Sequence, residues 1–357
     1  MSGLLLAWFA LALPAPHESA VQDPVATAPP PPTNVLFLLS DDQRYDTFGA
    51  LGNAAIRTPN LDALIERGTV LERIYCMGSN SGAVCAPSRA MLLSGRSLWR
   101  FPDYPDPAPD AIFFGGMADH FATPVHPFDP AGVFPKEARH AAEPFSSTAF
   151  ADAAVGFLER RQAADPPFFL FVSFTAPHDP RTPPEGFADR YVPQDLPLPA
   201  SFLPEHPFDN GELRIRDEKL APWPRTPEDV CEHLAAYYGM ISHLDQQVGR
   251  IFAALEQSGE LEHTLVVYAA DHGLAIGSHG LLGKQNLYEH SMRTTAILAG
   301  PGVPAGRRST ALGYLHDLYP TVCELAGLPL PRGLEARSLA PVVRGESEDG
   351  RPAIVTA

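Results

Sequence analysis

The stretch Asn34-Val-Leu-Phe-Leu-Leu-Ser40 contains an unbroken apolar run and ends directly in the pair Asp41-Asp42. A run of this length suits a strand that is buried on both faces, as the strands of a parallel sheet are. Two further apolar runs lie at 168–174 and 264–270, and the second of them ends in Asp271-His272. The pattern therefore predicts an α/β fold around a mainly parallel sheet.

Helix signals separate these strands. Residues 58–68 have Thr58 in the capping position, Pro59 at the first helical position and Gly68 just past the end. Residues 228–259 repeat apolar side chains at three- and four-residue spacing, which predicts a long helix with one buried face. The other predicted elements are strands at 70–75 and 295–300 and helices at 87–94, 146–161 (capped by Ser146) and 321–326.

The acidic residues at the ends of two predicted strands indicate a cation site. Because the carboxyl ends of parallel strands meet at one edge of a sheet, Asp41, Asp42 and Asp271 are expected to lie close together. Carboxylates gathered in this way are costly to bury without a cation. Oxygen ligands without a cluster of cysteines or histidines favour calcium or magnesium over zinc. A solvated turn is the alternative for Asp41-Asp42.

A second motif, Cys85-Ala-Pro-Ser-Arg89, is followed by a short helix-forming run that ends in Gly95-Arg96. On this motif the chain resembles the sulfatase family. The resemblance implies that Cys85 is oxidised after synthesis to formylglycine, whose hydrated aldehyde attacks sulfur. A buried structural cysteine before a proline-initiated turn is the alternative interpretation of the same residues.

The resemblance implies an alkaline-phosphatase-like sandwich, with helices on both sides of a mainly parallel sheet and a shortened C-terminal subdomain. It also implies that the chain hydrolyses a sulfate ester with the help of one calcium ion. The residues that correspond to the family's metal ligands are Asp41, Asp42, Asp271, His272 and the formylglycine derived from Cys85.

Three further residues take catalytic roles by the same resemblance. Arg89 would hold the nucleophile loop. His178 follows the 168–174 run in a Pro-His sequence, as does the family histidine that protonates the leaving oxygen, although a turn histidine is the alternative. Lys284 lies in a Gly-Lys sequence that resembles the family's second signature, whose lysine binds sulfate.

The region 97–145 departs from the family pattern. Sulfatases have a Gly-Lys-x-His segment here, and no such segment is found, so a block of the family domain is interpreted as missing. His120, His126, Lys136 and His140 are predicted to be surface residues, with Lys136 or His140 as the candidates for a substitute.

The sequence suggests four parts. Residues 1–20 are predicted to be a signal peptide and 21–33 a proline- and alanine-rich linker, which implies a secreted or periplasmic protein. Residues 34–346 are predicted to be the catalytic domain, with a proline-rich pocket rim at 183–227. Residues 347–357 are predicted to begin a shortened C-terminal region, with a strand-like piece at 353–356.

Composition restricts the partners. The net charge of −16 over 357 residues argues against nucleic acid or an anionic membrane surface. The apolar run near the amino terminus is too short to span a membrane. The four cysteines form no Cys-x-x-Cys spacing, and conversion of Cys85 would leave an odd number.

The partners expected from the resemblance are a sulfated small molecule or carbohydrate as substrate and a formylglycine-generating enzyme during maturation. Three other functions stay open at this point. They are a phosphoester or phosphonate hydrolase of the same architecture, a catalytically impaired remnant that binds calcium or an anion, and a hydrolase with Cys85 as an ordinary thiol nucleophile.

Overall fold

The computed structural model describes residues 34–79, 84–100, 119–125, 136–162 and 165–357. A six-stranded sheet in the order β5-β1-β6-β7-β2-β8 forms the centre of this part of the chain. Every pairing is parallel except the two that β7 makes, so the predicted mainly parallel sheet is confirmed. Its strands are β1 (Asn34–Ser40), β2 (Thr69–Tyr75), β5 (Phe169–Ser173), β6 (Thr264–Ala270), β7 (Arg293–Ala299) and β8 (Arg307–Tyr314).

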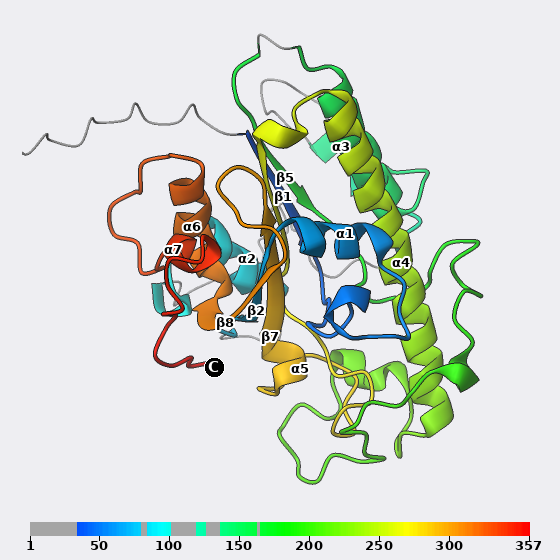
Figure 1. The fold of residues 1–357 in the computed structure, drawn as a ribbon. Coiled ribbons are helices and arrows are strands. Elements are labelled where there is room, and N and C mark those ends of the chain that lie inside the picture. The colour runs from blue at the N-terminus through cyan, green and yellow to red at the C-terminus, as the bar shows by residue number, and fades with distance from the viewer. Residues whose placement is uncertain (1–33, 80–83, 101–118, 126–135, 163–164) are drawn as a thin grey trace, which may run out of the picture. The chain divides into compact units, whose positions relative to one another are not determined.

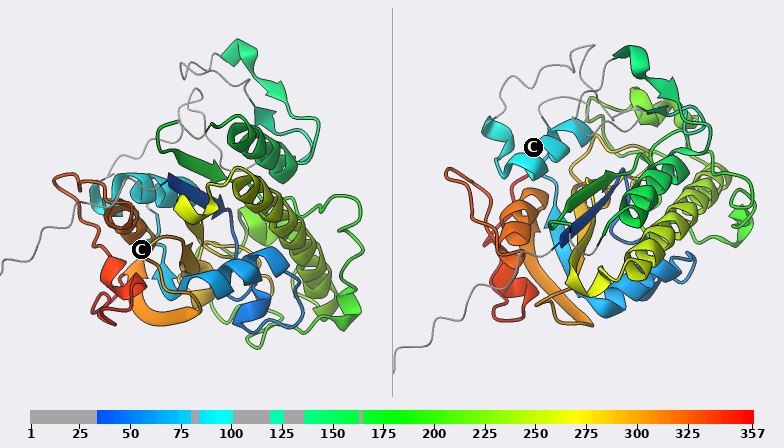
Figure 2. Two further views of the ribbon diagram at one scale, coloured as in Figure 1. Left: turned by 45° about the horizontal axis from the view of Figure 1, so that its top comes forward. Right: turned by 90° about the horizontal axis from the view of Figure 1, so that it is seen from above.

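Helices cover both faces of the sheet (Figures 1 and 2). One face packs against α1 (Pro59–Arg67), α3 (Ser146–Glu159) and α4 (Pro227–Gln257). The other packs against α2 (Cys85–Ser94), α6 (Leu318–Leu325) and α7 (Ala340–Val343). The structure also contains the short helix α5 (Glu289–Met292), the paired strands β3 (Pro124–Val125) and β4 (His140–Ala141), and short 3₁₀ helices in the connections.

Strands β1 and β6 are buried along their whole length, as their apolar runs predict. Successive side chains of a strand point to opposite faces, so Leu36 and Leu38 join the core under α4 while Phe37 and Leu39 join the core under α6. Burying one such side chain contributes about 1.5–3 kcal/mol, so the two cores hold this central pair of strands in place.

Three predictions about local structure are wrong. Strand β5 lies at the edge of the sheet, and its Phe169 is 59% exposed, so an apolar run did not mean burial on both faces. Ser146 does not cap α3, because its hydroxyl bonds the ring of His120 instead. Residues 353–356 form no strand. Strand β8 was not predicted from the sequence, because it begins with two arginines, Arg307 and Arg308.

Several expectations fall on residues outside the described part of the chain. They are the signal peptide, the linker and the position of His126. Among the described residues, the structure contains no helix with the length and apolar character needed to cross a membrane.

Asp245 ties the long helix α4 to the start of α1. Its carboxylate accepts the backbone N–H of Leu61 at 2.8 Å and of Asn60 at 3.1 Å, and the side-chain amide of Asn60 at 2.8 Å. An Asp245→Ala variant leaves these donors without a partner, so we expect it to lose about 2–3 kcal/mol in the free energy of unfolding. Urea unfolding measures this loss.

Asp152→Ala is the matched control, because Asp152 lies on α3 and also makes a side-chain contact with α4. Asp152 bonds Arg250 at 2.6 Å, but both side chains are over two-fifths exposed, so the expected loss is below about 1 kcal/mol. Equal losses in the Asp245 and Asp152 variants would contradict the capping role.

Candidate active site

The acidic residues converge at the carboxyl edge of the sheet. Strands β1 and β6 are parallel neighbours whose last residues, Ser40 and Ala270, pair with each other. Asp41-Asp42 and Asp271-His272 therefore leave the sheet side by side, as expected from the sequence. All four of these side chains are buried.

The backbone of Asp42 has a left-handed conformation with φ of 64°, which non-glycine residues rarely adopt. Two contacts hold it there. Its N–H donates to Asp271 Oδ1 at 3.1 Å, and its carbonyl accepts the hydroxyl of the buried Tyr237 at 2.6 Å. Strained backbone of this kind concentrates at functional sites, and here it accompanies a carboxylate that lies next to Asp271.

Helix α2 begins at Cys85 and is fastened to the end of β6. The Ser88 hydroxyl donates to the carbonyl of Asp271 at 2.8 Å. The guanidinium of Arg89 bridges two carboxylates, with Nη2 at 2.9 Å from Asp41 Oδ2 and Nε at 3.2 Å from Asp271 Oδ2. Because one planar group contacts both carboxylates, Arg89 fixes α2, and with it Cys85, against the acidic edge.

Cys85 Sγ lies among charged partners. His272 Nε2 is at 3.2 Å and Lys284 Nζ at 3.5 Å. Burial and the neighbouring Asp41 raise the pKa of the Cys85 thiol to about 11. A thiol with that pKa is protonated at neutral pH, which argues against Cys85 as an ordinary thiolate nucleophile in the metal-free protein.

Lys284 and the two histidines surround Asp42. Lys284 Nζ contacts both carboxylate oxygens at 2.7 and 2.8 Å, His272 Nδ1 lies at 3.2 Å and His178 Nε2 at 3.7 Å. Burial opposes the charge on Asp42, but Lys284 and the histidines hold the pKa of this carboxyl well below its usual range. Burial alone would lower the pKa of His178, yet Asp42 and Asp41 raise it to about 10.

The donor set fits a hard divalent cation. Potential ligand atoms of Asp41, Cys85, Asp271 and His272 lie within 4.8 Å of one another, as do those of Asp41, Asp42, Cys85 and His178. Within the described part of the chain, the buried Oδ1 of Asp41 has no hydrogen-bond partner. Burial and the neighbouring Asp271 raise the pKa of Asp41 to about 6. A buried carboxylate with a free oxygen beside another carboxylate is an environment that a bound divalent cation would stabilise.

His120 was predicted to lie on the surface, and this prediction is wrong. The ring is fully buried, with Nδ1 at 2.8 Å from the Ser146 hydroxyl and Nε2 at 2.7 Å from the carbonyl of His178. It stacks on Phe145 at 5.1 Å between ring centroids. Through its hydrogen bond to the carbonyl, His120 therefore helps to hold the backbone of His178 in place. His140, in contrast, is exposed as predicted.

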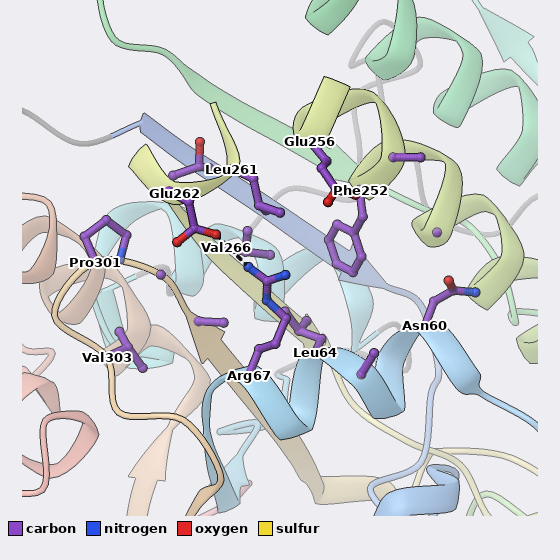
Figure 3. A pocket seen from close by; sticks show the side chains of 16 residues that line it. Asn60, Leu64, Arg67, Phe252, Glu256, Leu261, Glu262, Val266, Pro301 and Val303 are labelled. Carbon is purple, nitrogen blue, oxygen red and sulfur yellow. Dashed lines mark hydrogen bonds and ion pairs between the residues drawn. The ribbon is translucent and has the colours of Figure 1, made fainter. Parts of the chain in front are cut away.

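A pocket of about 500 Å³ lies between α1, α4, the beginning of β6 and the end of β7. Figure 3 shows the side chains that line it. Its rim carries an exposed ion pair in which Arg67 Nη2 lies 3.2 Å from Glu262 Oε1. Thr264, which lines this pocket, begins the strand whose other end leads to Asp271. The pocket thus lies at the amino-terminal end of β6, whereas the charged cluster lies at the carboxyl end of this strand.

Comparison with known families identifies the family of the chain. The family model described as Sulfatase matches residues 33–113 and 113–328. The chain belongs to the sulfatase family. The resemblance seen in the sequence is therefore confirmed, and the sulfatase motif Cys85–Arg89 lies where the acidic strand ends meet α2.

Two curated sulfatases illustrate the relationship. The iduronate 2-sulfatase of Mus musculus is 26% identical over 434 residues, covering 92% of this chain and 73% of its own length. The N-acetylglucosamine-6-O-sulfatase of Bacteroides thetaiotaomicron is 24% identical over 403 residues, covering 88% of this chain and 71% of its own.

Solved structures share the fold. The phosphonate monoester hydrolase of Agrobacterium radiobacter superposes with a TM-score of 0.67 at 25% identity, covering 90% of this chain and 78% of that one. The structure of BT4656 with its substrate D-glucosamine-2-N,6-O-disulfate has a TM-score of 0.69 at 20% identity, with 90% and 82% coverage. The alkaline-phosphatase-like sandwich expected from the sequence is confirmed.

Proposed function

We propose that this sulfatase-family protein hydrolyses a sulfate ester, R–O–SO₃⁻ plus water giving R–OH, sulfate and a proton, with Cys85 oxidised to formylglycine as the source of the nucleophile. One observation carries the proposal. Cys85 lies at the start of α2 within 3.5 Å of Lys284 and beside His272, at an edge where Asp41, Asp42 and Asp271 are all buried.

The residues divide the work by their chemistry. Asp41, Asp42, Asp271 and His272 would hold one calcium ion, with residue 85 next to it. When bound, calcium would supply positive charge to a sulfate oxygen and to the nucleophile. Arg89 keeps residue 85 against the carboxylates. Lys284 is placed to offset charge on the sulfuryl group, since its ammonium is a compact cation already in the site.

His178 is the proposed acid for the leaving oxygen. Its Nε2 faces the cluster at 3.7 Å from Asp42 Oδ2, and its Nδ1 contacts the carbonyl of Asp179 at 2.8 Å. Burial disfavours the charged ring, but Asp42 raises the pKa of His178 enough to keep it protonated at neutral pH. A protonated histidine can deliver a proton to an alkoxide as the sulfate ester breaks.

The names of the relatives favour a sulfated carbohydrate as the substrate, and those relatives act on iduronate and N-acetylglucosamine sulfates. The likeness to a phosphonate monoester hydrolase supports a second candidate, hydrolysis of a phosphonate monoester at the same residues. A formylglycine-generating enzyme would be the maturation partner, and a secreted or periplasmic location would fit this function.

The test is to co-express the chain with a formylglycine-generating enzyme, weigh the peptide that contains Cys85, and assay the converted protein with calcium. The substrates are the sulfate monoester, phosphate monoester and phenylphosphonate monoester of 4-nitrophenol, which share one leaving group. We expect conversion of Cys85 and the highest kcat/KM on the sulfate. A higher kcat/KM on the phosphonate would favour the second candidate. Conversion without turnover of any ester would contradict both.

A further inference from the structure

Glu218 contacts the backbone just before Lys284 and is not one of the reacting groups. The side chain is 4% exposed, and its carboxylate accepts the backbone N–H groups of the two residues that precede Lys284. Oε1 is 2.8 Å from the nitrogen of Gly283, and Oε1 and Oε2 are 3.1 and 3.0 Å from the nitrogen of Leu282. A buried carboxylate therefore holds the backbone of the loop that carries Lys284 (the Lys284 loop).

Arg225 compensates the charge of Glu218. Its Nη2 lies 2.7 Å from Glu218 Oε2 and 2.8 Å from the Glu218 carbonyl, and its guanidinium stacks 3.8 Å from the Trp223 ring centroid. Arg225 is 1% exposed. A buried ion pair is costly unless hydrogen bonds satisfy its charged groups. Here hydrogen bonds engage both carboxylate oxygens of Glu218 and both terminal nitrogens of Arg225, while Arg225 Nε has no hydrogen-bond partner in the described part of the chain. Removing one partner of such a buried pair lowers the free energy of unfolding much more than removing one partner of an exposed pair does.

The segment that carries Glu218 is fastened to the Lys284 loop at other points too. The carbonyl of Ser201 accepts the N–H of His279 at 2.7 Å, and Phe202 forms a β-bridge with Ser278. Gly280, with φ of +76°, approaches this segment so closely that an added Cβ would lie 2.5 Å from the carbonyl carbon of Glu205. Residues 201–225 thus form a fixed support for the loop.

We propose that Glu218 is a positioning residue for Lys284, a role that rests on the function proposed above. The ammonium of Lys284 lies at the end of a flexible side chain, and its contacts with Asp42 and Cys85 require the backbone at 282–283 to stay in place. Glu218 supplies that restraint by accepting the backbone N–H groups of both residues. Its loss displaces the cation from the sulfuryl group while the metal ligands remain in place.

The direct test is hydrogen–deuterium exchange over the peptide that contains Leu282 and Gly283. We compare the wild type with Glu218→Gln, which removes the charge, and Glu218→Asp, which retracts the carboxylate by one methylene group. Both variants are expected to exchange faster at these two amides. The matched control is Asp317→Asn, because Asp317 is also buried and accepts two backbone N–H groups and one arginine, elsewhere in the fold. It should leave the 282–283 amides unchanged.

The second readout is a double-mutant cycle on kcat/KM with Lys284→Ala. Glu218→Gln is expected to lower kcat/KM by about 10- to 100-fold, mostly through kcat, since a shift of about 1 Å in a reacting group can cost this much. In the Lys284→Ala background the same change should cost less than about threefold, because the residue that it positions is gone. The Asp317→Asn control should cost the same in both backgrounds.

An equal loss from Glu218→Gln in both backgrounds, or unchanged exchange at 282–283, would overturn the proposal. If the converted wild type hydrolyses no sulfate ester, the proposed function fails by itself. Hydrogen–deuterium exchange at residues 282–283 then decides by itself whether Glu218 holds the Lys284 loop.

Discussion

Replacing Cys85 with alanine is expected to abolish sulfate-ester hydrolysis, with kcat/KM falling by about a thousandfold or more. The reason is structural as well as chemical. His272 and Lys284 contact Sγ, and Asp41 and Asp271 offer ligand atoms within 4.8 Å of it, so the variant removes the atom on which these groups converge. The measurement is steady-state hydrolysis of 4-nitrophenyl sulfate by the converted wild type and by Cys85→Ala.

Cys231→Ala is the control for this prediction. Cys231 is also a free, buried cysteine, but it lies on α4 with its thiol 3.6 Å from the carbonyl of Leu196. We expect this variant to keep its activity within about twofold of the wild type, since it removes a sulfur without touching the cluster. More than a tenth of the wild-type activity in Cys85→Ala would show that another group acts as nucleophile.

Calcium is expected to raise the thermal unfolding midpoint of the protein and to be required for its activity. A ligand that binds the folded state at 100 times its Kd adds about 2.7 kcal/mol, which amounts to several degrees in a domain of this size. Removing the ion with a chelator should lower kcat by about a hundredfold or more, since the ion supplies charge to the reacting group. Thermal unfolding with and without calcium, in parallel with the ester assay, measures both effects.

The calcium effect should depend on pH in a definite direction. Burial and Asp271 raise the pKa of the Asp41 carboxyl to about 6 in the metal-free protein. A raised carboxyl pKa makes ionisation harder in the folded state, so this group makes the metal-free protein less stable as the pH rises from about 4 to about 6. Below about 6, calcium must displace a proton from Asp41. The calcium-induced shift in midpoint should therefore be larger at pH 7.5 than at pH 5.

Asp41→Asn tests whether the cluster is the binding site. This variant removes the charge of a carboxylate that has a free buried oxygen, so the calcium shift should largely disappear. Asp245→Asn is the matched control, because Asp245 is a buried carboxylate that caps α1, away from the cluster. It should unfold at a lower temperature yet keep the calcium shift. A full shift in Asp41→Asn would show that calcium binds elsewhere.

Sequence reasoning located the candidate site because its residues follow apolar runs that are easy to recognise. The central strands β1 and β6 are buried on both faces, so their sequences contain little besides aliphatic and aromatic residues. Parallel pairing then places Asp41-Asp42 and Asp271 together without any knowledge of the rest of the fold. The Cys85–Arg89 motif is local, and so it too could be recognised directly.

Edge strands and supporting residues could not be found in this way. Strand β8 begins with two arginines and contains no continuous apolar run, so its sequence does not resemble the buried strands β1 and β6. His120 follows no strand or motif, and only the fold shows that its ring supports the carbonyl of His178. In the sequence, nothing distinguishes Glu218 from the other charged residues of its proline-rich stretch. Its partners Leu282 and Gly283 are 64 and 65 residues away, so only the fold shows these contacts.

The sequence by itself determined the fold class, the family and the chemical types at the ends of the strands, because apolar runs, parallel topology and a contiguous motif are local properties of the chain. Only the tertiary structure decided which charges neutralise one another. Lys284 contacts Asp42 across 242 positions, and Arg89 bridges Asp41 and Asp271. Such pairings depend on desolvation and distance in the folded protein, and no spacing along the chain encodes either quantity.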